Sequence, residues 1–180
     1  MPHQILTSAK SAMLKEYKDH VEERLQQGIP PLPLNAEQVA DLVELLKSPP
    51  AGEEEFILDL IKNRTPAGVD PAAYVKAAFL TALAKGETSS PLIDKKLATE
   101  LLGTMLGGYN VESLIKLLKD EEVGAIAADG LSKTLLMFNA KHEVIELAAE
   151  NENAKRVVES WSNGEWFTSK SKLPEVIKAI

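Results

Sequence analysis

Three histidines are the side chains with which this sequence could most directly bind a metal ion or move a proton. They are His3, His20 and His142, and no two of them have the spacing of metal ligands on one helix. The sequence contains no cysteine, which excludes thiolate nucleophiles, disulfides and thiolate-bound zinc or iron–sulfur clusters. We therefore predict that this chain holds no metal and no cofactor.

Acidic side chains form two short runs, at residues 53–55 and 120–122. Clustered carboxylates can bind divalent cations, but each of these runs stands where a helix is expected to begin. Carboxylates at a helix N-terminus are stabilised by the partial positive charge of the helix dipole. We interpret both runs as helix starts rather than as sites of metal binding or acid–base chemistry.

The segment GTMLGGY contains Gly103, Gly107 and Gly108 but does not have the spacing of a phosphate-binding loop. It follows an expected helix rather than a strand, and neither GxGxxG nor the P-loop motif occurs in the sequence. The GxSxG elbow of serine hydrolases is absent as well. We predict a helix end and a turn here, and no catalytic residue anywhere in the chain.

Composition restricts the partners of this 180-residue, single-domain chain. With 27 acidic and 20 basic side chains the net charge is -7, which would repel a nucleic acid. Only the tail FTSKSKLPEVIK is mildly basic. The first dozen residues do not resemble a signal peptide, and no apolar run approaches the roughly 18 residues of a membrane span. We expect a cytoplasmic protein that binds neither membranes nor nucleic acid.

Start and stop signals of helices recur along the whole chain, and no segment alternates like a strand. Asn35 and Asp70 are expected N-caps, and Pro71 suits a first helical position. The segment IPPLPL, residues 29–34, must be extended, and a proline-rich ligand for a WW domain is a minor alternative for it. The expected helices with both ends assigned cover residues 11–27, 94–105, 120–138, 141–150 and 152–162.

Apolar stripes at helical spacing predict which side chains face the core. One stripe comprises Leu14, Tyr17, Val21 and Leu25, and another comprises Tyr74, Ala78, Phe79 and Ala82. Asn110 is expected to cap the helix that follows it. Gly124 and Gly130 are expected to admit the backbone of a neighbouring helix.

Helix pairs begin near Ala36, Pro71, Val111 and Lys141, a spacing of roughly 30 to 40 residues that is typical of helical repeats. Several helices are apolar over more than one stripe, as expected when a helix packs on its partner and on the next pair. We predict an all-α fold of about eight to ten helices, arranged as HEAT-like stacked hairpins. Because the pairs show little sequence similarity to one another, an irregular helical bundle remains the alternative.

The aromatic segment WSNGEWF, residues 161–167, is the most distinctive local feature. Trp161 is in phase with Val157 and Val158, which predicts that it belongs to the core. Trp166 and Phe167 come at the end of the domain, where either a cap of the core or a partner surface would use them. We name Trp166, Phe167 and Tyr109 as the candidate interaction surface.

Several long strings resemble the N-terminal HEAT-like domain of aconitase B, also called aconitate hydratase 2. They are LVELLKSPPAGEEEFILDLIKNR, GVDPAAYVKAAFL, LLGTMLGGYN, LSKTLLMF, ENAKRVVESW and EWF. The resemblance runs from about Met13 to Phe167. It implies a helical domain that packs beside catalytic domains, contributes to a passage toward the active site and mediates association. In the full enzyme, citrate and isocitrate are interconverted through cis-aconitate on a 4Fe–4S cluster.

The three cysteines that hold this cluster, and the catalytic domains, have no counterpart in this sequence. The resemblance therefore predicts an N-terminal extension at 1–12, a HEAT-like domain at 13–167 and a tail or short helix at 168–180. Our leading hypothesis is a non-catalytic protein–protein interaction domain, which self-associates or binds aconitase-type catalytic domains. The alternatives are an accessory part of a citrate/isocitrate hydro-lyase and, from the family alone, an RNA-binding regulatory module.

Overall fold

The computed structural model describes residues 2–134 and 140–164, with side chains from residue 12 onward. Within these residues the chain forms nine α-helices and no strand, as predicted. No helix of this part is long and apolar enough to cross a membrane. The helices are α1 (Pro2–Gln26), α2 (Ala36–Lys47), α3 (Glu54–Asn63), α4 (Pro71–Ala84), α5 (Lys95–Gly103), α6 (Val111–Leu117), α7 (Gly124–Ser132), α8 (Lys141–Leu147) and α9 (Glu152–Ser162).

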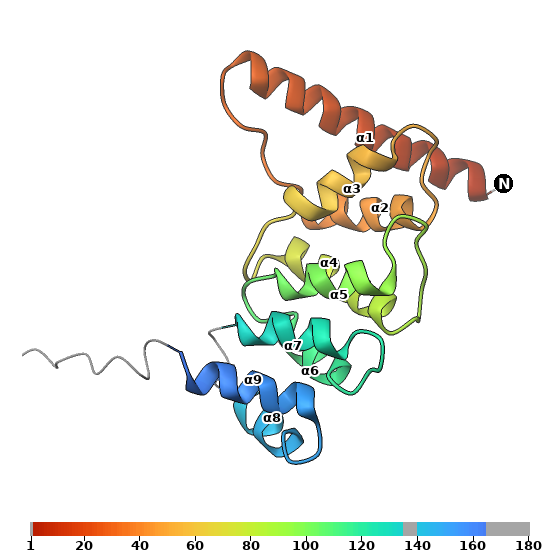
Figure 1. Cartoon of the computed structure of the whole chain (residues 1–180). Coiled ribbons are helices and arrows are strands. Elements are labelled where there is room, and N and C mark those ends of the chain that lie inside the picture. Colours follow the sequence, from red (N-terminus) through yellow and green to blue (C-terminus); the bar gives the residue numbers. More distant parts are fainter. Residues whose placement is uncertain (1, 135–139, 165–180) are drawn as a thin grey trace, which may run out of the picture.

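The helices form a stack of hairpins that descends from α1 to α8 and α9 (Figure 1). The four hairpins are α2/α3, α4/α5, α6/α7 and α8/α9, and their first helices begin at Ala36, Pro71, Val111 and Lys141. The predicted HEAT-like arrangement and its repeat spacing are therefore confirmed. One hydrophobic cluster extends through all the layers, from Met13 in α1 to Val157 in α9.

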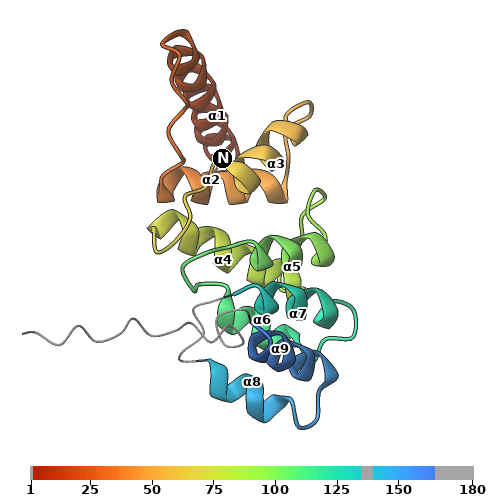
Figure 2. The ribbon, with the colours of Figure 1, turned by 60° about the vertical axis from the view of Figure 1, so that its left-hand side comes forward.

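The contacts between layers change along the stack. In the N-terminal part, the first helices pack on each other, α2 on α4. In the C-terminal part, the second helices of the hairpins pack on each other: α5 contacts α7, and α7 contacts α9 (Figure 2). Gly103 of α5 and Gly130 of α7 permit the α5–α7 contact, because a Cβ on Gly130 would lie 2.7 Å from the Cα of Gly103. The prediction that Gly130 admits a neighbouring backbone is confirmed.

Side-chain caps place the starts of four of the described helices. The Asn35 side chain accepts from the Gln38 amide at 2.9 Å, and the Gln38 side chain accepts from the Asn35 amide at 3.0 Å, which completes a capping box. Asp70 caps α4, with Pro71 at the first helical position. The side chains of Asp94 and Asn151 likewise accept from backbone amides in the first turns of α5 and α9.

Three predicted helices have boundaries that are wrong by three residues or more. The first helix begins at Pro2 rather than Ser11, and the segment between them contains residues such as alanine, lysine and glutamine that favour helix. The helix predicted for 120–138 covers only Gly124–Ser132, because Asp120 forms a turn by accepting from the amides of Glu122 and Val123. Residues 135–139 lie outside the described part. Helix α8 ends at Leu147 rather than at residue 150, because the following turn leads into the extended N-cap of α9.

Two predicted core stripes are wrong in part, because neighbouring helices determine which faces are covered. Leu25 is 64% exposed, although Leu14 and Tyr17 of the same stripe are buried. Tyr74 and Ala78 are exposed on α4. The α4 side chains that face the core are Ala72, Ala73, Lys76, Ala77, Phe79, Leu80, Leu83 and Ala84.

Asn110 does not cap α6 with its side chain, contrary to the prediction. It is buried, and its amide group donates to the carbonyls of Leu102 at 2.7 Å and Met105 at 3.2 Å. Leu102 lies in the last turn of α5, where carbonyl groups lack helical partners, and Met105 follows the end of this helix. Asn110 therefore ties the end of α5 to the start of α6.

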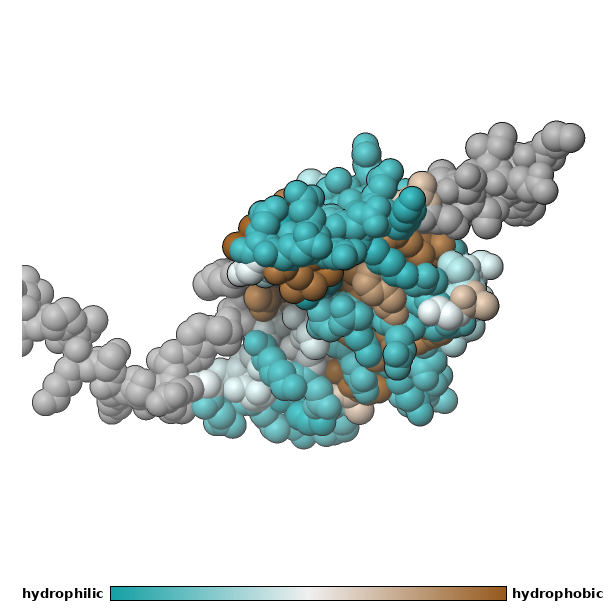
Figure 3. Space-filling view, turned by 90° about the horizontal axis from the view of Figure 1, so that it is seen from above, coloured by the Kyte–Doolittle hydropathy of each residue, from teal (hydrophilic) through white to brown (hydrophobic). Residues whose placement is uncertain are grey.

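At the N-terminal end of the stack, α1 lies across α2 and covers it (Figure 1). Met13, Leu14 and Tyr17 are buried on the inner side of α1, while its outer surface is mostly hydrophilic (Figure 3). The extended segment 29–34 is fixed to α1, because the Tyr17 hydroxyl donates to the Leu32 carbonyl at 2.7 Å. Burial raises the pKa of the Tyr17 phenol, so this group stays a hydrogen-bond donor.

Candidate interaction surface

The residues singled out for chemistry do not meet in the structure. His20 is on α1 and accepts a hydrogen bond from the Leu32 amide at 3.0 Å, whereas His142 is exposed on α8 at the other end of the stack. The side chain of His3 lies outside the described part. Within the described residues, no group of three or more histidine, cysteine or acidic side chains is placed to hold a metal ion.

The two acidic runs serve the fold. Glu53 precedes α3 and forms an ion pair with Lys18 of α1 at 2.6 Å. Asp120 forms an ion pair with Lys95 of α5 at 2.7 Å. The hydrogen bond from Lys95, together with those from the Glu122 and Val123 amides, holds the pKa of the Asp120 carboxyl below its usual value. Both runs thus connect consecutive layers.

Lys76 is the only buried charged side chain in the described part, and the sequence reasoning missed it. Burial lowers its pKa to about 8. Its ammonium group donates to the Lys62 carbonyl at 3.4 Å, in the last turn of α3, where the helix dipole favours a cation. A lysine within the apolar run of α4 was the available signal. Lys76 lines none of the three grooves described below, so we assign it no reaction.

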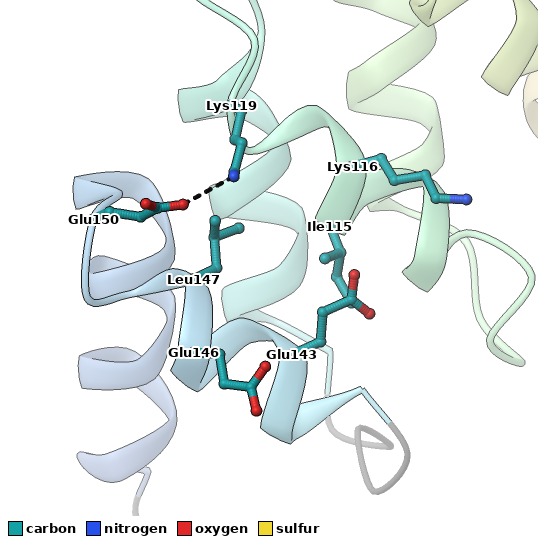
Figure 4. Close-up of a pocket in the computed structure, with 7 residues that line it drawn as sticks. All are labelled: Ile115, Lys116, Lys119, Glu143, Glu146, Leu147 and Glu150. Atoms are coloured by element: carbon teal, nitrogen blue, oxygen red, sulfur yellow. Dashed lines mark hydrogen bonds and ion pairs between the residues drawn. The ribbon is translucent and has the colours of Figure 1, made fainter.

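A charged groove of about 440 Å³ separates α6 from α8 (Figure 4). Ile115 of α6 and Leu147 of α8 form its apolar floor. An ion pair between Lys119 and Glu150, 3.0 Å apart, spans one end. Both of these side chains are largely exposed, and exposed ion pairs contribute about 0 to 1 kcal/mol. The groove holds no nucleophile next to a base, so it indicates no reaction.

A different surface exposes apolar side chains together. We define the apolar shelf as Val69, Tyr74, Leu106 and Tyr109, whose exposed fractions are 74%, 60%, 67% and 36%. The rings of Tyr74 and Tyr109 meet edge to face, with their centroids 5.4 Å apart. Soluble monomers rarely expose large apolar side chains in a group, and such groups are typical of interaction sites.

Two loops hold the apolar shelf in place. The loop between α3 and α4 and the loop between α5 and α6 lie on the same side of the stack and pack backbone to backbone (Figure 1). Gly107 has a φ of +93°, and a Cβ there would lie 2.3 Å from the carbonyl carbon of Gly68. The Tyr109 hydroxyl donates to the Val69 carbonyl at 3.1 Å. The shelf is therefore built on fixed backbone.

A groove of about 280 Å³ continues from the shelf between α4 and α6. Its floor consists of small side chains of α4, among them Ala78 and Ala82, and Tyr74 and Tyr109 line one end. A hydrogen bond of 2.8 Å between the hydroxyls of Thr81 and Ser113 joins the two helices. The small floor residues keep the groove free of long side chains along α4.

Of the three residues predicted for an interaction surface, the structure describes one. Tyr109 belongs to the apolar shelf, and Trp166 and Phe167 lie outside the described residues. The sequence reasoning missed Val69, Tyr74 and Leu106. Val69 follows a glycine and Leu106 precedes one, and a large apolar residue in such a loop was a usable signal.

Comparisons with known proteins give a consistent result. The sequence matches the family model described as the aconitate B N-terminal domain over residues 16–167. Aconitate hydratase B of Pseudomonas aeruginosa is 62% identical over 164 residues, which cover 91% of this chain and 19% of that protein. The Escherichia coli protein of the same name is 58% identical over 164 residues, with the same shares. That of Helicobacter pylori is 45% identical over 168 residues, or 92% of this chain and 20% of that protein. The chain thus spans about a fifth of the length of these relatives.

Proposed function

The chain belongs to the family of aconitate B N-terminal domains, and from this premise we propose that it is a non-catalytic, cytoplasmic association module. The observation that carries the proposal is the apolar shelf, which consists of Val69, Leu106 and Tyr109 on two loops in backbone contact and of Tyr74 in α4. A rigid apolar surface loses little conformational entropy when it binds, which favours association. The partner would be a second copy of the chain or an aconitase-type catalytic domain.

Catalysis by this chain alone is not part of the proposal. The resemblance to aconitase B implies a 4Fe–4S cluster held by three cysteines, and this chain does not fit such a group because it contains no cysteine. A cluster of this kind would need ligands from outside these 180 residues. We expect the purified chain to leave citrate and isocitrate unchanged.

Charge substitution on the shelf tests the association module. We expect Val69→Lys combined with Leu106→Lys to weaken binding at least about tenfold, because each charge would lose water at an apolar contact. Both side chains are exposed, so the fold should persist. Leu25→Lys is the matched control, since Leu25 is 64% exposed on α1, away from the shelf. Light scattering measures self-association, and pull-down measures binding to catalytic domains.

A chain that stays monomeric and captures no catalytic domain would overturn the proposal. If the shelf variant and Leu25→Lys weakened binding equally, the contact would not be at the shelf.

A second candidate function is that of an accessory part of a citrate/isocitrate hydro-lyase, which shapes access to an active site. It is favoured by the relatives, which are aconitate hydratases about five times as long as this chain. The test adds the chain in trans to an aconitase B that lacks this domain. A change in turnover or in KM for citrate supports this role, and unchanged kinetics at saturating chain argue against it.

RNA binding, the third hypothesis, has no structural observation in its favour. Lys95, Lys116 and Lys119 each form an ion pair with a carboxylate. Gel shifts at two salt concentrations test the idea, because binding through phosphates weakens steeply with salt. We expect no shift even at low salt.

A further inference from the structure

The segment IPPLPL, residues 29–34, leads from α1 to α2 and contains neither helix nor strand (Figure 1). A proline fixes its own φ and restricts the residue before it to extended backbone. The prolines at positions 30, 31 and 33 therefore restrict all of residues 29–33. Consecutive residues of this kind form a polyproline II helix, which has three residues per turn.

Burial along the segment follows this period of three residues. Leu34 is fully buried, and Pro31, three residues before it, is half-buried, so both lie on the edge that faces the protein. The side chains of the other two edges are exposed, and they are Ile29, Pro30, Leu32 and Pro33. Pro30 and Pro33 are three residues apart and therefore share one exposed edge.

Three side chains of α1 hold the segment in place. Arg24 donates through Nε to the Pro30 carbonyl at 3.0 Å, and the Tyr17 hydroxyl donates to the Leu32 carbonyl at 2.7 Å. The Leu32 amide donates to Nε2 of His20 at 3.0 Å. All three bonds use backbone atoms of the segment, so they leave its exposed side chains available for a partner. A segment that is already held loses little conformational entropy when it binds.

We propose that residues 29–34 form a proline ridge that docks into a partner domain whose groove is lined with aromatic side chains, as in a WW domain. Such grooves bind polyproline II segments with two prolines three residues apart, the spacing of Pro30 and Pro33. Charge favours the same partner, because residues 25–36 contain no charged side chain in a chain of net charge -7. The ridge precedes α2 and shares no residue with the apolar shelf, so this proposal does not rest on the association module.

Binding of the full chain to a purified WW domain tests the proline ridge. The probe is a WW domain that binds a synthetic peptide of residues 26–36, and NMR titration of the labelled domain gives both dissociation constants. We expect the chain to bind up to about tenfold more tightly than the peptide, because α1 already holds the ridge. A chain that binds more weakly than the peptide would overturn the proposal, since the ridge would then be inaccessible in the folded protein.

Variants of the full chain locate the contact. Pro30→Ala combined with Pro33→Ala should weaken binding to the WW domain at least about tenfold, because both prolines of the exposed edge are lost. Leu25→Ala is the matched control, since Leu25 is 64% exposed at the end of α1 but lies outside the ridge. Equal weakening by the control would contradict the proposal. Val69→Lys combined with Leu106→Lys should leave this affinity unchanged, and a loss there would assign the contact to the apolar shelf instead.

Discussion

At the N-terminal end of the stack, α1 lies across α2 and buries Met13, Leu14 and Tyr17, whereas at the C-terminal end the groove between α8 and α9 leaves Ile145 and Trp161 partly open. Each inner layer is covered by a layer on either side, but an end layer has only one neighbour. The described part of the chain supplies a cover at one end only. This difference teaches that the two end layers of one stack can be covered to different extents.

The largest effect is expected at the covered end. Tyr17→Ala should lower the free energy of unfolding by about 4 kcal/mol, because it removes a buried aromatic ring. Tyr17→Phe removes only the hydroxyl that donates to Leu32 and should cost about 1 kcal/mol. Urea unfolding measures both values. If Tyr17→Ala proved as mild as Leu25→Ala at an exposed site, α1 would not be the cover that the structure indicates.

Lys76 allows an inner layer to be compared with the covered end, because it is a buried charge two layers below α1. Its pKa is lowered to about 8, so the unfolded chain binds more protons than the folded chain between about pH 8 and the usual lysine pKa of about 10.4. The free energy of unfolding should therefore rise with pH over this window. Lys76→Met should raise the free energy of unfolding at pH 7 by up to about 3 kcal/mol. It should also remove the increase of this free energy between about pH 8 and 10.4.

Urea unfolding from pH 7 to 10.5 measures both consequences of the Lys76 substitution. Lys62→Met is the matched control, because the Lys62 side chain is exposed and only its carbonyl contacts Lys76. A pH profile that rises equally in the natural chain and in Lys76→Met would assign the effect to another group.

The sequence predicted the features that depend on local chemistry. The capping box of Asn35 and Gln38, and the pairing of Asp70 with Pro71, set helix starts through bonds within a few residues. The starts of the first two hairpins followed from these signals, and the spacing of the helix pairs predicted the stacked fold. Gly130 was recognisable because glycine in a helix needs a packing reason.

The sequence did not predict features that depend on which neighbour covers a face. Helix α4 is apolar almost all round, so its pattern could not reveal that Tyr74 faces solvent. Asn110 was a good N-cap by type, but its amide group donates to the Leu102 and Met105 carbonyls instead. Tyr109 remains a predicted interaction residue. Neighbouring glycines were a usable signal for Val69 and Leu106, but only the fold shows the contact of Tyr109 with Tyr74.

At the open end, Trp161→Ala should lower the free energy of unfolding by about 2 kcal/mol, less than Tyr17→Ala, because Trp161 is only half-buried. The indole N–H donates to the Leu131 carbonyl at 3.0 Å, so Trp161→Phe should cost about 1 kcal/mol through that bond alone. A loss equal to that of Tyr17→Ala would show that the two ends are equally well covered.

The smallest effect concerns the polar contacts that hold α1 over α3. Lys18 forms an ion pair with Glu53 at 2.6 Å, and its ammonium lies 5.0 Å from the centre of the Phe56 ring. Both contacts are partly exposed, so Lys18→Met should lower the free energy of unfolding by only about 0.5 kcal/mol. Half a molar salt should remove most of this difference, because it screens exposed ion pairs. Lys15→Met, on the same helix without such a pair among the described contacts, is the control. A loss above about 2 kcal/mol that salt removes would mean that α1 is held by charge as well as by the burial of Tyr17.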